Sequence, residues 1–190
     1  DLKGVLGKPK PVGGQRPLLM SAGASEAGKA FAARHADCLF MTIFDMDRVP
    51  GDAQTLRALA PPGRHPGVYA SGHLFTRKTE KETKEWYDYI VHENGDWEAA
   101  EHIINIRVAG GGQSVPHDVV KKRAPQLIAG IGTSPMVGSY DQVAEKFKYL
   151  SDCGLDGMAI GMVNYVDEFP ILQEEILPRM ERLGLRNPVR

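Results

Sequence analysis

The sequence predicts an α/β fold built on a parallel sheet. Short apolar runs alternate with amphipathic helical segments along the chain, which is the pattern of βαβ units. One run, residues 38–44 (CLFMTIF), is continuously apolar, as expected for a parallel strand covered on both faces. Several of the helical segments begin with a capping residue. Alternation of this kind implies a parallel sheet, either open and doubly wound or closed as a barrel.

Four strands are predicted, at residues 17–22, 38–44, 67–75 and 157–163. The first (PLLMSA) is an apolar run that enters a glycine-rich turn, and the others are apolar runs bounded by turn residues. Four strands cannot close a barrel on their own.

The first helices are predicted from their caps. Ser25 is the expected N-cap of a helix that reaches His35 and turns Ala27, Ala30 and Phe31 inward. A short helix is expected at residues 53–59. Thr79 opens another with a capping box, because Glu82 follows three residues later. The buried stripe of that helix is Trp86, Tyr87 and Ile90.

The second half of the chain contains three further helical regions. Residues 92–128 contain two short helices and a glycine-rich stretch, and we expect them to be an insertion within a single domain of residues 1–190. Ser139 caps the next helix, whose stripe is Val143, Phe147 and Leu150 and which Gly154 ends. The last helix, residues 167–183, has apolar residues at helical spacing: Phe169, Leu172, Ile176, Met180 and Leu183.

The composition excludes some classes of partner. The net charge of the 190 residues is −1 with both signs mixed, which argues against nucleic acid and against an anionic membrane. No apolar stretch has the length of a membrane span. Cys38 and Cys153 lack metal-ligand spacing, so we expect two buried thiols in a cytoplasmic protein, and no metal site. The charged residues 77–85 are expected to form a solvated helix face. Because the chain opens on Asp1 in a loop-like stretch, we expect residues upstream.

Residues 21–31 (SAGASEAGKAF) predict an anion site. They follow a strand and open a helix, and Gly23 allows the backbone to approach a ligand closely. A tight strand-to-helix turn without a ligand is the alternative, and the pattern alone leaves both open.

The same segment matches the GxxxxGK pattern of a phosphate-binding loop, from Gly23 to Lys29. Asp45, after the second strand, has the position of a magnesium-associated acid. Ala30, however, stands where such a loop has the Ser or Thr that holds magnesium. A nucleotide hydrolase is therefore the second hypothesis.

Two separated segments carry a resemblance to a known family. Residues 15–41 (QRPLLMSAGASEAGKAFAARHADCLFM) resemble the fifth strand, fifth helix and sixth strand of the bacterial-luciferase-like flavin monooxygenases. Residues 136–185 are similar to that family's last helix, eighth strand and closing helix. Within that family, the sequence is most similar to the branch of pyrimidine oxygenase, dimethyl sulfone monooxygenase and alkanesulfonate monooxygenase.

The resemblance implies a TIM (β/α)8 barrel of which this chain has the C-terminal four strands, with the site at the carboxyl ends of the strands. It also implies reduced FMN as cofactor, supplied by an NAD(P)H-dependent flavin reductase. Oxygen adds to the flavin, and the resulting peroxyflavin oxygenates a small organic substrate. A deazaflavin coenzyme, used by a sister group, is the less expected cofactor, and a homo-oligomer is expected.

At the positions that match the family, the resemblance implies that Ser21, Gly23, Ala24 and Ser25 hold the FMN phosphate. Lys29 would then be a helix surface residue. His73 resembles a histidine that borders the reacting flavin, so it is the candidate catalytic residue. An arginine of the alkanesulfonate enzymes is Ser71 here, which argues against sulfonate recognition. Asn164 and Tyr165, after the last strand, are candidate substrate-binding residues, although packing within the loop is the alternative. A non-catalytic flavin-binding half-barrel is the third hypothesis.

Overall fold

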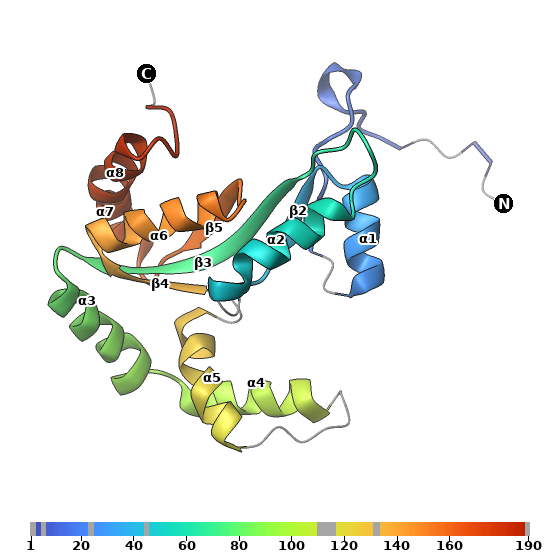
Figure 1. Cartoon of the computed structure of the whole chain (residues 1–190). Coiled ribbons are helices and arrows are strands. Elements are labelled where there is room, and N and C mark those ends of the chain that lie inside the picture. The colour runs from blue at the N-terminus through green and yellow to red at the C-terminus, as the bar shows by residue number, and fades with distance from the viewer. Residues whose placement is uncertain are drawn as a thin grey trace.

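The computed structural model describes residues 3–4, 7–22, 25–43, 46–109, 117–130 and 134–188. At its centre is a sheet in which every strand pair of the described residues is parallel. The strands are β1 (Met20–Ser21), β2 (Cys38–Met41), β3 (Gly67–Arg77), β4 (Ser134–Ser139) and β5 (Gly157–Gly161). The predicted α/β fold with a parallel sheet is therefore confirmed (Figure 1).

The longest strand, β3, pairs with three others: with β2 at residues 67–70, with β5 at 69–73 and with β4 at 72–77. Ala70 pairs with both β2 and β5, and His73 pairs with both β4 and β5. Because a strand has only two edges, β2 and β4 share one edge of β3 and β5 lies at the other. The four predicted strands thus follow the neighbour order β1-β2-β3-β5. A barrel requires such sequential order, whereas an open doubly wound sheet reverses it.

β4 is not predicted from the sequence. Its segment contains Pro135 and Gly138, which are both unfavourable in strands, and it is short. Pairing with the second half of β3 nevertheless makes it a strand, because Met136 becomes completely buried there.

The predicted strand limits differ from the observed ones mainly at β1. Of residues 17–22 only Met20 and Ser21 pair with β2, and the side chains of Leu18 and Leu19 are exposed. The reason is that β1 lies at the end of the sheet, where no described strand covers its outer edge. β2 and β5 end earlier than predicted, and β3 continues to Arg77.

One face of the sheet is covered by α1 (Glu26–His35), α2 (Val49–Ala58), α6 (Tyr140–Asp152) and a C-terminal helix (Figure 1). The C-terminal helix consists of α7 (Tyr165–Ile171), the π-helical turn η4 (Leu172–Ile176) and α8 (Leu177–Arg182). The main core lies between these helices and the strands, and its most buried side chains include Leu39, Val68, Ala70, Met136, Val143 and Ile176.

A second group of helices follows β3 (Figure 1). It comprises α3 (Glu80–Tyr87), the π-helical turn η3 (Asp88–Glu93), α4 (Trp97–Ala109) and α5 (His117–Gly130). Phe75, Val91 and Ala129 form one buried cluster there, and Ala100, Ile104 and Ala124 form another between α4 and α5. The expected insertion, residues 92–128, thus contains α4 and most of α5. No helix of the described residues combines the length and apolar character that crossing a membrane requires.

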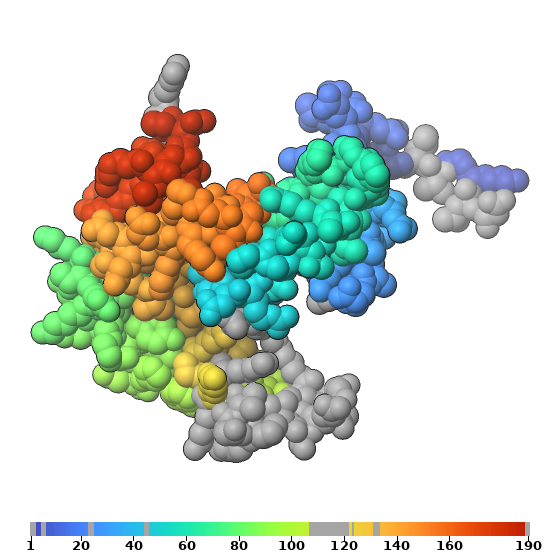
Figure 2. All heavy atoms as spheres, in the orientation of Figure 1, coloured from blue at the N-terminus to red at the C-terminus, as the bar shows by residue number. Residues whose placement is uncertain are grey.

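Short 3-10 turns, η1 (Val12–Gly14) and η2 (Met46–Arg48), complete the described elements. Figure 2 shows the segment around η1 as a dark blue arm beside the body of the protein.

The predicted caps are confirmed, but the predicted burial is wrong for Ala27, which is exposed, and for Phe31 and Phe169. Ser25, Thr79 and Ser139 are the N-caps of α1, α3 and α6, and the last two form complete capping boxes. Phe31, expected to face inward, is 61% exposed, and Phe169 is 51% exposed. In α1 the buried residues are Ala32 and Ala33 instead, because the helix packs so closely on the sheet that only small side chains fit.

The two faces of β3 differ in character. Val68, Ala70 and Leu74 belong to the main core, so they face the covering helices. Side chains alternate along a strand, and Tyr69, Ser71 and His73 therefore lie on the opposite face, where each is half-buried. This opposite face of β2, β3 and β5 is called the open face below.

Candidate active site

The carboxyl ends of parallel strands meet at one edge of a sheet, and the candidate residues are distributed along that edge. Ser21 ends β1, Gly161 ends β5, and Asn164 begins the helix after β5. His73 is at the level of Gly161 in the register of β3 and β5. Enzymes with barrels of parallel strands have their active sites at this edge.

β1 ends at Ser21, and α1 begins at Glu26 with Ser25 as its N-cap, so a strand precedes this helix as the sequence predicts. The Oγ of Ser25 accepts a hydrogen bond from the Gly28 N–H at 3.1 Å, so the hydroxyl keeps its own proton for donation. The first N–H groups of a helix have no partner within it. A hydroxyl and backbone N–H groups therefore stand together at the positive end of the helix dipole, where an anion is stabilised. Gly23 and Ala24 lie outside the described residues.

Lys29 has the role expected from the flavin-enzyme resemblance. Its Nζ forms an ion pair with the Glu26 carboxylate of the same helix at 3.1 Å. This contact occupies the ammonium group on the helix surface, where the phosphate-loop hypothesis needs it to reach a nucleotide. Ala30, in addition, offers no hydroxyl for magnesium.

His73 lies on the open face, close to the main-chain atoms of β5. A Cβ built on Gly161 would be only 2.6 Å from His73 Nε2, so the imidazole ring covers that glycine. Burial lowers the pKa of His73, which favours the neutral imidazole at neutral pH. A neutral imidazole can donate one hydrogen bond and accept another. Ala70 and Leu74, which alternate with His73 along β3, belong to the core under the covering helices, so the alternation of the strand directs His73 to the other face.

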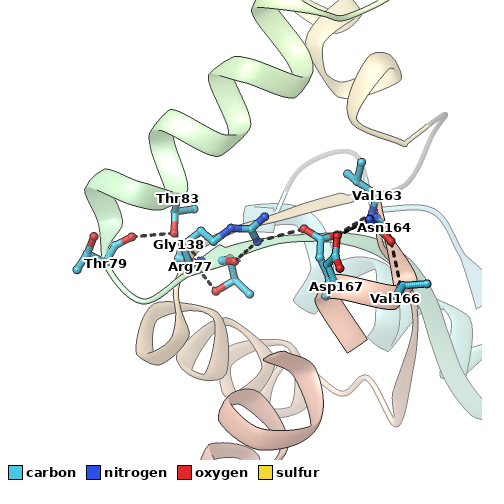
Figure 3. Close-up of polar contacts among 10 residues, drawn as sticks. Arg77, Thr79, Thr83, Gly138, Val163, Asn164, Val166 and Asp167 are labelled. Atoms are coloured by element: carbon cyan, nitrogen blue, oxygen red, sulfur yellow. Dashed lines mark hydrogen bonds and ion pairs between the residues drawn. The ribbon is translucent and has the colours of Figure 1, made fainter. Parts of the chain in front are cut away.

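The loop after β5 is held together by its own polar groups (Figure 3). Asn164 caps α7, because its Oδ1 accepts from the Val166 N–H at 3.0 Å and its Nδ2 donates to Asp167 at 2.6 Å. The amide of Asn164 is thus occupied by the cap. Tyr165 is 58% exposed.

A buried ion pair, missed from the sequence, joins this loop to β3 (Figure 3). Glu168 of α7 is 4% exposed, and its Oε1 pairs with Arg77 Nη1 at 3.1 Å. Its other oxygen accepts from the Val163 and Asn164 N–H groups. The Arg77 guanidinium lies 4.3 Å from the centre of the Trp86 ring.

The prediction that Arg77 belongs to a solvated charged face is therefore wrong. Its charge is neutralised by a residue 91 positions later in the chain, and no sequence spacing reveals such a contact. In the sequence, the indication that Arg77 lies at the site is its position just after the carboxyl end of the predicted strand 67–75.

A hydroxyl network fixes the ends of β3 and β4 beside this pair (Figure 3). The Gly138 carbonyl accepts from Thr76 Oγ1 at 2.8 Å and from Thr83 Oγ1 at 3.1 Å. Thr83 Oγ1 also accepts from the Arg77 N–H at 3.0 Å. Buried hydroxyls that are satisfied in this way make the carboxyl edge of the sheet rigid.

Other features lie away from this edge. An apolar cavity of about 350 Å³ lies between α6, β5 and the C-terminal helix, on the covered side of the sheet. Cys38 and Cys153 are free, half-buried thiols. Among the residues that the structure describes, no three His, Cys, Asp or Glu side chains are grouped so that they could hold a metal ion.

Two monooxygenases are similar to this chain in sequence. The chain is 26% identical to the FMNH(2)-dependent dimethylsulfone monooxygenase of Pseudomonas fluorescens (strain Pf0-1), over 93% of this chain and 49% of the relative. It is also 26% identical to the long-chain alkane monooxygenase of Geobacillus thermodenitrificans (strain NG80-2), over 89% of this chain and 41% of the relative. The chain thus spans about half the length of the curated relatives it matches.

A solved structure supports the fold. The crystal structure of DmoA from Hyphomicrobium sulfonivorans superposes with a TM-score of 0.74, covering 88% of this chain and 42% of that one, at 16% sequence identity. The match to about half of the longer protein is consistent with a partial barrel. The model of the luciferase-like monooxygenase family matches residues 1–157, and the chain therefore belongs to the luciferase-like monooxygenase family.

Proposed function

We propose that the protein to which this chain contributes is an FMN-dependent monooxygenase, which uses reduced FMN and O2 to oxygenate a small organic substrate. The observation that carries the proposal is the family match over residues 1–157. FMN is favoured over a deazaflavin because the dimethylsulfone monooxygenase relative carries FMNH(2) in its name.

The start of α1 is the proposed site of the FMN phosphate, with Ser21, Gly23, Ala24 and Ser25 as its residues. A phosphate dianion fits there because the helix start offers backbone N–H donors and the hydroxyl of Ser25 keeps a proton to donate. The Glu26 carboxylate in the first turn does not oppose the anion strongly, since Lys29 neutralises it. Hydrogen bonds to a charged group contribute about 1.5–3 kcal/mol each.

His73 is the proposed catalytic residue. Bound reduced FMN supplies the electrons that activate O2. The neutral imidazole of His73 then holds or delivers a proton at the carboxyl edge of the sheet, where substrate and flavin ring are expected. A partly enclosed ring has the advantage of a fixed direction, which proton transfer requires.

Partners follow from the same proposal. A separate flavin reductase supplies the reduced FMN, and the protein forms a homo-oligomer. Asn164 and Tyr165 border the substrate; the exposed ring of Tyr165 is the more available of the two, because Asn164 already caps α7.

A flavin-binding half-barrel without catalysis is the second candidate, because the start of α1 offers an anion site whether or not His73 takes part in a reaction. Binding of FMN without turnover by the protein that contains this chain would support it.

Binding of FMN with and without the serine hydroxyl tests the proposal. Ser25→Ala should weaken FMN binding about 10- to 100-fold, which is the effect of losing a hydrogen bond to a charged group. Ser139→Ala is the control, because the Ser139 hydroxyl also accepts from the N–H three residues later but caps another helix, α6. Quenching of FMN fluorescence measures both affinities. Equal affinity in wild type and Ser25→Ala would refute the phosphate site, and magnesium-dependent ATP hydrolysis would favour the nucleotide hydrolase.

Turnover is tested with compounds that appear in the names of the two related monooxygenases. Dimethyl sulfone and a long-chain alkane are offered to the protein with photoreduced FMN and O2, and the oxygenated product is measured by mass spectrometry. Photoreduction replaces the reductase, so absence of a suitable reductase cannot hide activity.

A further inference from the structure

Two aromatic side chains of β3 lie directly over glycines of β5. Tyr69 pairs in register with Gly157, and His73 pairs with Gly161. A Cβ at Gly157 would lie 2.6 Å from Tyr69 Cε1, and one at Gly161 would lie 2.6 Å from His73 Nε2. Real Cβ atoms do not approach other atoms below 3.0 Å. Each ring therefore occupies space that any other residue on β5 would fill.

The backbone does not explain these glycines. Neither Gly157 nor Gly161 has a positive φ, unlike Gly154, where φ is 99° and a side chain would be strained. Glycine is also unfavourable inside a strand, because it has no side chain to pack. At Gly161 the useful property is therefore the absence of a side chain beneath the ring.

We propose that Gly161 is a positioning residue for His73, which holds the imidazole flat against β5 and so sets the direction of its nitrogen atoms at the carboxyl edge of the sheet. The inference rests on the proposed function of His73.

The direction of the ring follows from which atoms approach Gly161. Nε2, Cε1 and Cδ2 of His73 would lie 2.6, 2.7 and 3.0 Å from a Cβ at that position, so the far side of the ring is the part in contact. An alanine would push these atoms away from β5, towards the open face. The displacement is on the order of 1 Å, which is enough to lower a reaction rate about 100-fold when the group must be aligned with its target.

Gly157 provides the matched comparison. It lies on the same face of β5 under Tyr69, with the same close approach, but at the beginning of the strand instead of its carboxyl end. Gly157→Ala should disturb the packing of the sheet to a similar degree without displacing His73. A merely structural role of glycine in β5 predicts equal effects of both substitutions.

The test compares wild type, Gly161→Ala and Gly157→Ala of the FMN-loaded whole protein. The first readout is the imidazole Cε1–H signal of His73 in an NMR spectrum, assigned by its loss in His73→Asn. Gly161→Ala should shift this signal and Gly157→Ala should not. An unchanged signal in Gly161→Ala, or equal shifts in both variants, would overturn the proposal.

A double-mutant cycle tests the functional part. Gly161→Ala should lower turnover about 10- to 100-fold with FMN affinity within about twofold, and it should add nothing once His73 is already Asn. An additive loss in the double variant would show that Gly161 does not act through His73. If the wild type has no turnover, the proposed function fails, while the NMR comparison still decides whether Gly161 positions the ring.

Folding is the remaining control. If Gly161→Ala does not fold, the variant that also carries His73→Ala should fold, because removal of the ring makes room for the new methyl group. Failure of this rescue would overturn the proposed contact.

Discussion

At the scale of single residues, the carboxyl edge of the sheet combines two different kinds of group. Arg77 and Glu168 neutralise each other in an ion pair, in which Arg77 Nη1 also donates to the Thr76 carbonyl and the second Glu168 oxygen accepts from the Val163 and Asn164 N–H groups. His73, by contrast, is half-buried on the open face, and burial lowers its pKa, which favours the neutral imidazole. The ion pair therefore fixes the loop after β5, and the imidazole adds a group at the same edge that can donate and accept a hydrogen bond.

His73→Asn should lower turnover by about 10²–10⁴-fold, the usual effect of losing a general acid–base group. Affinity for FMN should stay nearly unchanged, because the phosphate site at α1 is untouched. Steady-state oxygenation and FMN fluorescence measure the two quantities separately. His65→Asn, an exposed histidine on a loop, is the control. Wild-type turnover in His73→Asn would remove this residue from the mechanism.

Asp37 gives the protein a predictable dependence on pH. Hydrogen bonds from the Arg16 guanidinium and from the Leu19 N–H hold the pKa of Asp37 far below its usual value. A carboxyl group whose pKa is lowered by folding stabilises the protein above its unfolded pKa of about 3.9, and this stabilisation is lost as the pH falls towards the folded pKa.

The free energy of unfolding of Asp37→Asn should therefore be lower than that of wild type above pH ~5, and the difference should shrink as the pH approaches ~2. Urea denaturation at several pH values measures it. Glu98→Gln, at an exposed position of α4, should show a small difference throughout. A difference for Asp37→Asn that is constant with pH would contradict the ion-pair explanation.

At the scale of elements, β4 shows how a strand can form against its local preferences. Its six residues include a proline and a glycine, yet its register with β3 is continuous. The side chains that point into the core supply the compensating burial, and Met136 is the largest of them.

Met136→Ala should accordingly destabilise the protein by about 2–5 kcal/mol, as for other large core side chains replaced by alanine. Val12→Ala, at a fully exposed position, should change the free energy of unfolding by less than about 0.5 kcal/mol. Chemical denaturation measures both. A loss below about 1 kcal/mol for Met136→Ala would mean that residues 134–139 behave as a surface loop.

At the scale of the whole molecule, the central strand of the sheet is hydrogen-bonded along both edges, and the outer strands are hydrogen-bonded along one edge by the described residues. β3 has partners along both edges, whereas β1 and β5, like β4, each have one described neighbour. Large exposed apolar side chains accompany two of these outer strands: Leu18, Leu19 and Met20 near β1, and Val163, Tyr165 and Val166 after β5.

Hydrogen exchange should follow this order. The main-chain amides of β3 are expected to exchange most slowly, those of β5 faster, and those of β1 fastest, because exchange requires the hydrogen bonds of a strand to open. Mass spectrometry of peptides from the exchanging protein gives the three rates. Protection of residues 20–21 equal to that of β3 would contradict the expected order and would show that the outer edge of β1 is covered in the protein.

The sequence alone was sufficient to predict the structural features that depend on residues close together in the chain. The N-caps at Ser25, Thr79 and Ser139 follow from side chains within three positions, and the burial of Val143 and Leu150 follows from helical periodicity. The parallel sheet and the family followed because apolar runs and two family segments occur in the right order.

Only the tertiary structure decided the features that depend on distant residues. The burial of Glu168 against Arg77, the pairing of β4 with β3 and the contact of His73 with Gly161 all join segments more than 50 positions apart. The face of α1 that is buried was likewise determined by its close packing on the sheet and not by the size of Phe31. Local propensity and periodicity contain no information on such contacts, because the energy of burial depends on which surfaces the completed fold brings together.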